Sequence, residues 1–200
     1  MSFDFKTDYT LEDERVLLRP LAIGDVEYLL PYSIQEPELW DHSSVHAIGE
    51  AGLKNYLLKA LKGRKDEKEY PFIVFDKHTN EYAGSTRFYD MQLNAGCLQL
   101  GYTWYGKEFQ GTGLNKHCKY LLLQFAFEQL RMERVEFRAD NTNLRSIAAM
   151  KSIGCSVEGI LRSNVVRHNG TRRDSIVLSI LKPEWEEQIK RNLLQKLQVT

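Results

Sequence analysis

Apolar residues follow two different periods on either side of a glycine turn near the middle of the chain. Between positions 98 and 105, Leu98, Leu100, Tyr102 and Trp104 alternate with more polar neighbours, as in a half-buried strand. After the turn, apolar side chains recur at helical spacing, at Leu114, Cys118, Leu121, Leu122, Phe125 and Leu130. A second alternation follows over residues 134–139. The order strand, glycine turn, helix, strand predicts a βαβ unit whose two strands are parallel.

The other periodicities complete an α+β domain. They predict a mixed, mostly antiparallel sheet of about seven strands, with helices on both faces and the parallel pair flanking the glycine turn. The further strands are expected at residues 15–20, 70–75, 83–90, 157–161 and 175–181. Helices are expected from Val26 to a stop near Pro31, over residues 50–62, from the capping cluster at 140–143 to Gly154, and from Pro183 onward. Asn169-Gly170 is typical of a two-residue hairpin.

We divide the chain into an N-terminal tail (residues 1–14), one domain (15–181) and a C-terminal amphipathic helix (182–200). The tail is either loose or a strap across the domain. The C-terminal helix carries an apolar stripe that needs a partner, in its own domain or in a second subunit, so a homodimer stays open. Residues 32–49 have no clear period, and we expect them to form a wall of a substrate pocket.

Composition narrows the function classes. The chain has 200 residues and a formal net charge of +0, which gives no bulk electrostatic reason to expect nucleic-acid binding. No apolar run is long enough for a membrane span or resembles a signal segment. The three cysteines have neither metal nor redox spacing, so we expect reduced thiols, no metal and a cytoplasmic protein.

The glycine turn carries the candidate chemistry. Gly111 and Gly113 stand just before the helix, where the first N–H groups lack internal partners and the macrodipole is positive. We therefore expect the N–H groups of residues 111–115 to hold a phosphate or pyrophosphate. The turn is not a dinucleotide fingerprint, because Lys116 replaces the third glycine, and no Walker loop follows. A tight turn that binds nothing remains the alternative.

Four stretches together resemble the GNAT superfamily of N-acetyltransferases. They are residues 15–21 with Asp25, residues 100–104, residues 110–115, and residues 143–146 leading to Gly154. The third is similar to the family's Gln/Arg-x-x-Gly-x-Gly/Ala pyrophosphate loop, and the fourth to its Asn-x-x-Ser helix. Within the superfamily the chain resembles the RimJ/RimL-like branch, whose named members acetylate ribosomal-protein N-termini.

The resemblance implies acetyl-CoA as the donor and assigns roles to residues. The pantetheine arm would pair like an added strand beside Thr103 and Trp104, and Asn143 would reach it. Ser146 would lie near the thiol as a weak donor to the leaving thiolate. The full set of expected cofactor-binding residues is Thr103, Trp104, Gln110, Gly111, Thr112, Gly113, Leu114, Asn115, Lys116, Asn143 and Ser146.

Three positions depart from the family's pattern. Asn115 stands where the loop usually ends in glycine or alanine, and its side chain would either crowd or cap the phosphate. Met150 occupies a position that is tyrosine in many members, and it has no proton to donate to a thiolate. Gln99 replaces a glutamate that can act as a base in relatives.

We therefore expect direct transfer of acetyl to a primary amine, of a small molecule or a protein N-terminus, with positioning as the main source of acceleration. The general base is left open among a water chain, Asp90, Glu108 and His117, although His117 fits core packing better. Arginines near the 169–170 hairpin suggest a carboxylate-bearing acceptor or simply a solvated hairpin. The alternative functions are an acyl-CoA-binding module with weak or lost catalysis and a structural protein whose turn is empty.

Overall fold

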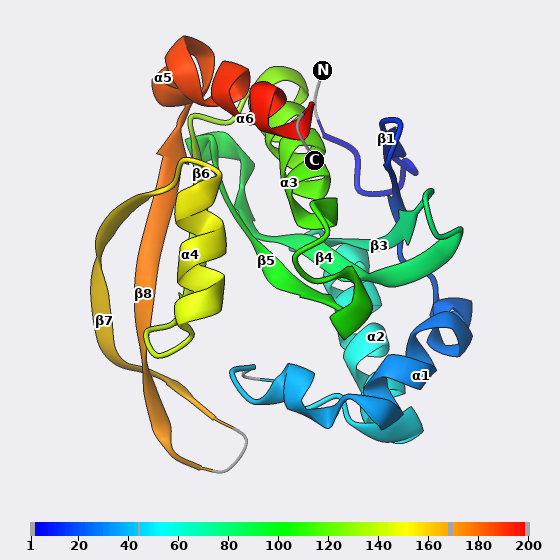
Figure 1. Ribbon diagram of the computed structural model, residues 1–200. Coiled ribbons are helices and arrows are strands. Elements are labelled where there is room, and N and C mark those ends of the chain that lie inside the picture. The colour runs from blue at the N-terminus through cyan, green and yellow to red at the C-terminus, as the bar shows by residue number, and fades with distance from the viewer. Residues whose placement is uncertain (1–2, 44, 168–169, 199–200) are drawn as a thin grey trace.

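An eight-stranded sheet forms the centre of the molecule (Figure 1), in the order β1-β2-β3-β4-β5-β6-β8-β7. The computed structural model describes residues 3–43, 45–167 and 170–198. The strands are β1 (Leu11–Glu12), β2 (Val16–Pro20), β3 (Tyr70–Asp76), β4 (Glu81–Gln92), β5 (Cys97–Tyr105), β6 (Arg134–Asp140), β7 (Ser156–Val166) and β8 (Arg172–Leu181). All neighbours are antiparallel except β5 and β6, which are parallel as the sequence predicts. The eighth strand beyond the seven expected is the two-residue β1.

Helices cover both faces of this sheet. They are α1 (Val26–Gln35), α2 (Gly49–Lys65), α3 (Leu114–Gln124), α4 (Leu144–Ser152), α5 (Lys182–Glu184) and α6 (Lys190–Leu197). Strand β3 shows the two faces, because successive side chains of a strand point in opposite directions. Phe72 and Val74 pack in the core that includes α3, whereas Ile73 packs with Leu29 of α1 and Leu53 of α2. The α+β fold is therefore confirmed.

Helix α1 does not end at Pro31 as expected but continues to Gln35. The proline leaves one helical hydrogen bond unmade. The next turn is fixed from outside the helix, because the Tyr32 hydroxyl donates to the Tyr82 carbonyl at 3.0 Å and Ser33 Oγ donates to the Ala47 carbonyl at 2.5 Å. These tertiary contacts override the local stop signal.

Both ends of the chain pack on the domain. In the N-terminal segment, Phe5 is buried, and Tyr9 N donates to the Tyr70 hydroxyl at 2.9 Å, so the segment is a strap and not a loose tail. At the other end, Trp185 is fully buried beside Tyr120 of α3. The C-terminal stripe thus finds its partner within the same domain.

Strands β5 and β6 separate after a very short ladder. Their paired positions run only from Cys97–Arg134 to Gln99–Glu136. Beyond Gln99, β5 stays paired with β4 and β6 stays paired with β8, so each has a free edge toward the other. Figure 1 shows the two strands diverging, with α4 beside one of them and the turn before α3 beside the other. This divergence opens the sheet next to the glycine turn.

Candidate active site

The glycine turn leads into α3 with a row of unused backbone donors. Gly111 and Gly113 have φ values of +80° and +92°, in the left-handed region that favours glycine. Among the described residues, no protein atom accepts a hydrogen bond from the amides of Gly111, Thr112, Gly113 or Asn115. Four amides without protein acceptors at the positive end of a helix form an anion-binding geometry.

A buried ion pair supports the turn from beneath. Arg15 Nε donates to Asp76 Oδ1 at 2.8 Å, and its guanidinium also reaches the backbone and hydroxyl oxygens of Thr112, each at 3.5 Å. Thr112 Oγ1 donates in turn to the Phe109 carbonyl at 2.8 Å. Burial alone would raise the pKa of Asp76, but hydrogen bonds from Arg15 and the His78 amide hold it below its usual value. The turn therefore rests on a fixed charged pair.

Side chains of the turn leave its backbone accessible. Asn115 Oδ1 accepts a hydrogen bond from the Tyr105 hydroxyl at 3.2 Å, so this side chain is held by β5 and makes no hydrogen bond to the described amides of the turn. Gln110 donates to the Tyr105 carbonyl at 2.9 Å and accepts a hydrogen bond from Arg145 of α4. Leu114 is fully buried, and Lys116 makes no hydrogen bond or ion pair through its side chain with any described residue. The Gln110–Arg145 contact brings α4 against the turn.

The first turn of α4 presents the two other predicted residues. Asn143 caps the helix, because its Oδ1 accepts from the Ser146 amide at 3.0 Å. Its Nδ2 makes no hydrogen bond with any described residue. Ser146 is partly buried on the same turn. Met150 is buried in the main core. Asn143 and Ser146 thus lie close to the glycine turn.

The free edge of β5 carries the remaining pair, Thr103 and Trp104. Thr103 Oγ1 is 2.7 Å from Thr86 Oγ1 and accepts a hydrogen bond from Lys119 Nζ, also at 2.7 Å. Trp104 is buried against Trp40, with ring centroids 5.1 Å apart. The side chains at these positions are therefore fixed, and the backbone between β5 and β6 is left for a ligand.

Lys119 is a residue that the sequence analysis did not single out. It is 5% exposed and has no ion-pair partner among the described residues, and burial lowers its pKa to about 8. The spacing of the sequence could have indicated this burial. Leu122 and Ala126, three and seven residues after Lys119, are both buried, so Lys119 lies on the same inward face of the helix.

Gln99 does not stand alone on the sheet. Its Nε2 donates to Asp90 Oδ2 at 2.8 Å, while its Oε1 is buried without a hydrogen-bond partner. Asp90 itself is exposed and has a φ of +45° at the irregular end of β4. The carboxylate of Asp90 is thus hydrogen-bonded to the side chain at position 99, where relatives carry a glutamate.

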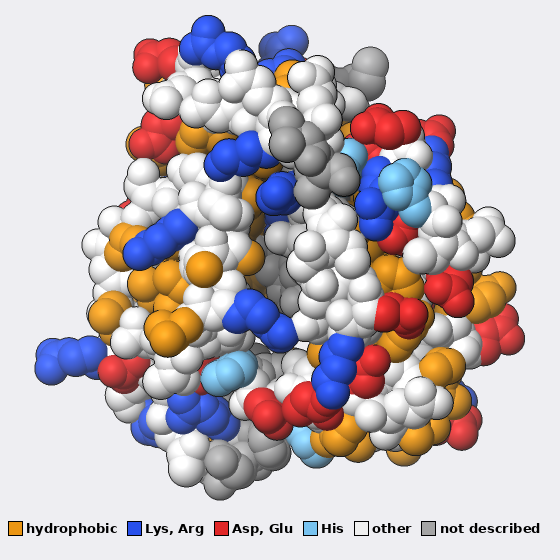
Figure 2. All heavy atoms as spheres, viewed as in Figure 1, with side chains coloured by type: hydrophobic (Ala, Val, Ile, Leu, Met, Phe, Trp, Pro, Cys, Tyr) orange, Lys and Arg blue, Asp and Glu red, His pale blue; other side chains and the backbone are white. Residues whose placement is uncertain are grey.

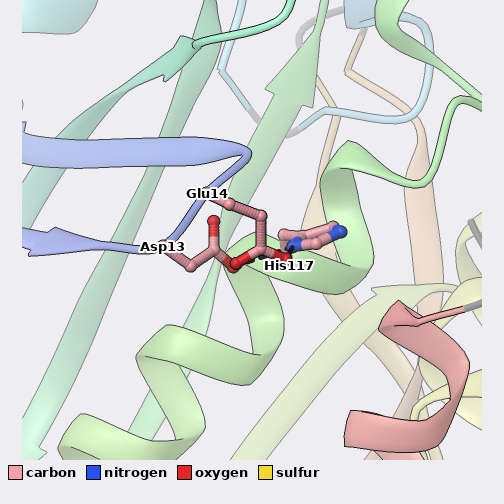
Figure 3. A group of neighbouring side chains, drawn as sticks. All are labelled: Asp13, Glu14 and His117. Atoms are coloured by element: carbon pink, nitrogen blue, oxygen red, sulfur yellow. Dashed lines mark hydrogen bonds and ion pairs between the residues drawn. The ribbon is translucent and has the colours of Figure 1, made fainter.

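His117 lies away from the β5–β6 opening, against the N-terminal strap (Figure 3). Its Nδ1 is 2.7 Å from Asp13 Oδ2 and 4.0 Å from Glu14 Oε1. These three side chains form a group that could hold a metal ion. Asp13 Oδ1, however, already accepts from the amides of Arg15 and Val16, so the group is explained as a strap-to-helix connection. His117 is buried in this contact, in keeping with the packing role that the sequence analysis preferred for it over a role as a base.

The cysteines take no part in this site. All three are free, and burial raises the pKa of Cys118 and Cys155 to about 12. Such thiols stay protonated at neutral pH and are poor nucleophiles.

The surface is hollowed where these elements meet (Figure 2). The hollow lies between α4 and the turn before α3, and several Lys or Arg side chains stand around it. No helix of the described residues has the length and hydropathy to cross a membrane.

A sequence model of the acetyltransferase (GNAT) domain family matches residues 15–156, more than half of the chain. The chain belongs to the GNAT acetyltransferase family. It is therefore an acyltransferase whose curated relatives are named as N-acetyltransferases. One of these relatives, the "Probable N-acetyltransferase YjcK" of Bacillus subtilis (strain 168), is 26% identical over 183 residues, which cover 88% of this chain and 99% of YjcK.

Solved GNAT structures agree with this assignment. A crystal structure described as a "putative acetyltransferase" from T. thermophilus has a TM-score of 0.86 and 32% identity, covering 98% of this chain and 99% of that one. Mycobacterium smegmatis RimJ in complex with CoA-disulfide shares the fold, with a TM-score of 0.77 and 16% identity over 94% of this chain and 93% of RimJ. The predicted membership, with RimJ-like proteins among the structural relatives, is confirmed.

Proposed function

We propose that this GNAT N-acetyltransferase transfers acetyl from acetyl-CoA to a primary amine by direct attack within a ternary complex. One observation carries the proposal: four amides without protein acceptors among the described residues belong to the turn that lies beside the place where β5 and β6 diverge (Figure 1). Phosphate binding at such a helix N-terminus needs only backbone donors. RimJ, whose complex holds CoA-disulfide, has the same fold, which supports this assignment.

The free edge of β5 gives the rest of the donor a place. In this proposal the diphosphate binds the amides of residues 111–115, and the pantetheine amides pair with β5 beside Thr103 and Trp104, as an added strand does. Asn143 Nδ2 would donate to the same arm. The acetyl carbon then lies at the opening between β5 and β6.

The chemistry requires little more than positioning. A thioester is already activated, and a neutral amine attacks its carbonyl to form a tetrahedral oxyanion that strand amides can stabilise. Collapse breaks the C–S bond, and the proton lost by the amine balances the one gained by the thiolate. Ser146 is proposed as a weak donor to that thiolate. Asp90 and Glu108 are both exposed, so either carboxylate could act as the base through water, whereas His117 is buried against the strap.

A second candidate function is an acyl-CoA-binding module with weak or lost catalysis. Gln99 and Met150 favour this alternative. Relatives carry a glutamate base and a tyrosine acid at these two positions, and neither glutamine nor methionine can transfer a proton in the same way. Release of free thiol from acetyl-CoA across a panel of amines decides between the two. Thiol release that needs an amine supports the enzyme, and CoA binding without turnover supports the module.

Gly113→Val tests the site itself. Valine is strained at a φ of +92°, so the turn must change shape and misdirect its amides. We expect the Kd for CoA, measured by isothermal titration calorimetry, to rise about tenfold or more, the loss of one or two charge-assisted hydrogen bonds.

Gly49→Val is the matched control. Gly49 also has a positive φ, +70°, with nothing within 4 Å of an added Cβ, but it begins α2, away from the turn. Both variants should lose stability, and only Gly113→Val should lose affinity. Unchanged CoA affinity in a folded Gly113→Val protein would contradict the proposed site.

A further inference from the structure

One face of the sheet is polar across the opening between β5 and β6. Residues paired across a ladder point to the same face, and every second residue of a strand shares it. Tyr89 pairs with Gln99, Gln99 with Glu136, and Glu136 with Ser179. The same alternation adds Arg138 and Asp140 on β6, and Ser175 and Arg173 on β8, with Val177 as the one apolar residue between the two serines. The opposite face carries core residues such as Phe137 and Leu178. An acceptor that approaches from this side therefore meets charged and hydroxyl groups.

Most of the arginines on this face already have carboxylate partners. Arg138 Nε lies 2.7 Å from Glu136, and Arg167 pairs with the buried Asp140 at 2.6 Å. Arg173 differs from them. No carboxylate of the described residues lies within ion-pair distance of it, and its one hydrogen bond to a described residue goes from Nη1 to the His42 carbonyl at 2.8 Å.

Arg173 also carries an unused donor inside the protein. Its Nε is buried and has no hydrogen-bond partner among the described residues, and burial lowers the pKa of the guanidinium. On the same face of β8, Ser175 Oγ is likewise buried and unpartnered. A buried polar atom without a partner is unfavourable by itself, so two of them on adjacent same-face positions point to a ligand that bonds both.

The guanidinium lies near the opening. Its bond to His42 reaches the segment that was expected to wall the substrate pocket. The rings of Tyr89 on β4 and Tyr102 on β5 have centroids 5.0 Å apart. Burial raises the pKa of both tyrosines, and the positive charge of Arg173 acts in the opposite direction on both. Arg173 therefore faces the β4–β5 side of the opening from the β8 side.

We propose that Arg173 binds a carboxylate on the amine acceptor, with Ser175 as its neighbour, and so selects acceptors that carry an anion near the amine. This inference rests on the proposed acetyl transfer. A carboxylate matches the planar fork of a guanidinium. It would also supply a counter-charge at contact distance, because Asp140 acts on Arg173 only from further away and is already paired with Arg167. Free amino acids and peptides that begin with an acidic residue share this chemistry, whereas polyamines lack it.

Matched acceptors test the preference without altering the protein. Amino acids are compared with the amines left by their decarboxylation, and peptides beginning with Asp or Glu with those beginning with Asn or Gln, by thiol release from acetyl-CoA. We expect kcat/KM to be about 10- to 100-fold higher for the carboxylate member of each productive pair, the range for a charge-assisted hydrogen bond. The productive set, amino acid or peptide, identifies the source of the carboxylate.

Arg173→Gln should remove that difference. Its KM for the carboxylate acceptor should rise about 10- to 100-fold while kcat changes little, and values for the uncharged analogue should stay the same. Arg173→Lys keeps the charge but loses the fork, so it should fall between the two. Arg172→Gln is the control, because Arg172 is exposed and hydrogen-bonds Ser163 instead.

The outcomes separate this inference from the function on which it rests. If amines with and without the carboxylate react equally well, or if Arg173→Gln leaves the preference intact, the enzyme stands and the role of Arg173 is overturned. If no amine of either kind promotes thiol release, the proposed acetyl transfer fails, and the inference fails with it.

Discussion

Lys119 shows how one side chain can oppose the stability of the fold that surrounds it. Its ammonium is buried, and its one hydrogen bond to a described residue goes to Thr103 Oγ1. A buried cation without a counter-charge lowers the free energy of unfolding, and this one lies beside the strand that we propose to bind pantetheine. A positive charge at this place would favour an anionic ligand, and in the absence of ligand it lowers the free energy of unfolding.

Lys119→Met should therefore stabilise the protein at pH 7. The folded-state pKa, about 8, lies below the ordinary value of 10.5. Below pH 8 the wild type is protonated in both states and carries the full penalty. Between pH 8 and about 10.5 the unfolded state holds more protons, so wild-type stability rises with pH. We expect a gain of roughly 1–3 kcal/mol at pH 7 that shrinks by pH 10, measured by urea unfolding at both pH values. A gain that does not change with pH would contradict burial of the charge as its cause.

At the scale of elements, the glycine turn and β2 are tied together by the Arg15–Asp76 pair. Both side chains are buried, and the arginine alone reaches Thr112. The pair thus joins the residue before β2, the last residue of β3 and the turn before α3, three segments far apart in the chain. Its contribution lies in holding the turn in place as much as in stability.

Asp76→Ala should lower the free energy of unfolding much more than removal of both charges does. It leaves Arg15 buried without its partner, which destabilises by about 3–5 kcal/mol, whereas Arg15→Met with Asp76→Leu keeps the site apolar and recovers most of that loss. The double variant should still bind CoA about 3- to 10-fold more weakly, because Thr112 loses its support. Urea unfolding and calorimetry measure the two effects separately. Equal stability of single and double variants would argue against an uncompensated charge.

The turn and its helix were predictable from sequence because glycine spacing and apolar periodicity are local signals. The direction of the Asn115 side chain was not, since it depends on Tyr105, ten residues earlier. The separation of β5 from β6 was equally hidden, because the alternation of a strand does not show where its pairing ends. The alternation expected over residues 98–105 is itself wrong beyond Leu100, since an irregularity at Tyr102, whose φ is +49°, puts Leu98 and Leu100 in one core and Trp104 in the other. Arg173 stood out only as one of several arginines, and its lack of a carboxylate partner among the described residues is a tertiary property.

At the scale of the whole molecule, the two chain ends close the same apolar core. The strap contributes Phe5, and the C-terminal segment contributes Trp185, whose ring stacks on Phe127 at 5.5 Å. Trp185 Nε1 also donates to Glu128 at 3.1 Å. The terminal segments are therefore parts of the folded domain, and the apolar stripe near the C-terminus packs on its own chain.

Trp185→Ala should lower the free energy of unfolding by about 3–5 kcal/mol, the usual loss for a large aromatic core residue. Leu194→Ala, in the same segment but 38% exposed, should cost about 0.5 kcal/mol or less. Chemical denaturation at two protein concentrations measures both. A midpoint that rises with protein concentration would instead indicate that the stripe packs between subunits.

The three-position ladder between β5 and β6 has a consequence for how the free and loaded proteins unfold. The two parts of the sheet share little backbone hydrogen bonding, so cooperativity between them relies on the core and on α3. A donor molecule bound along β5 would bond both the turn and the strand edge, and folding would then be linked to its concentration. At a hundredfold excess over Kd this linkage amounts to about 2.7 kcal/mol. Bound acetyl-CoA would then extend the sheet at the edge of β5 and stabilise the folded protein for as long as it stays bound.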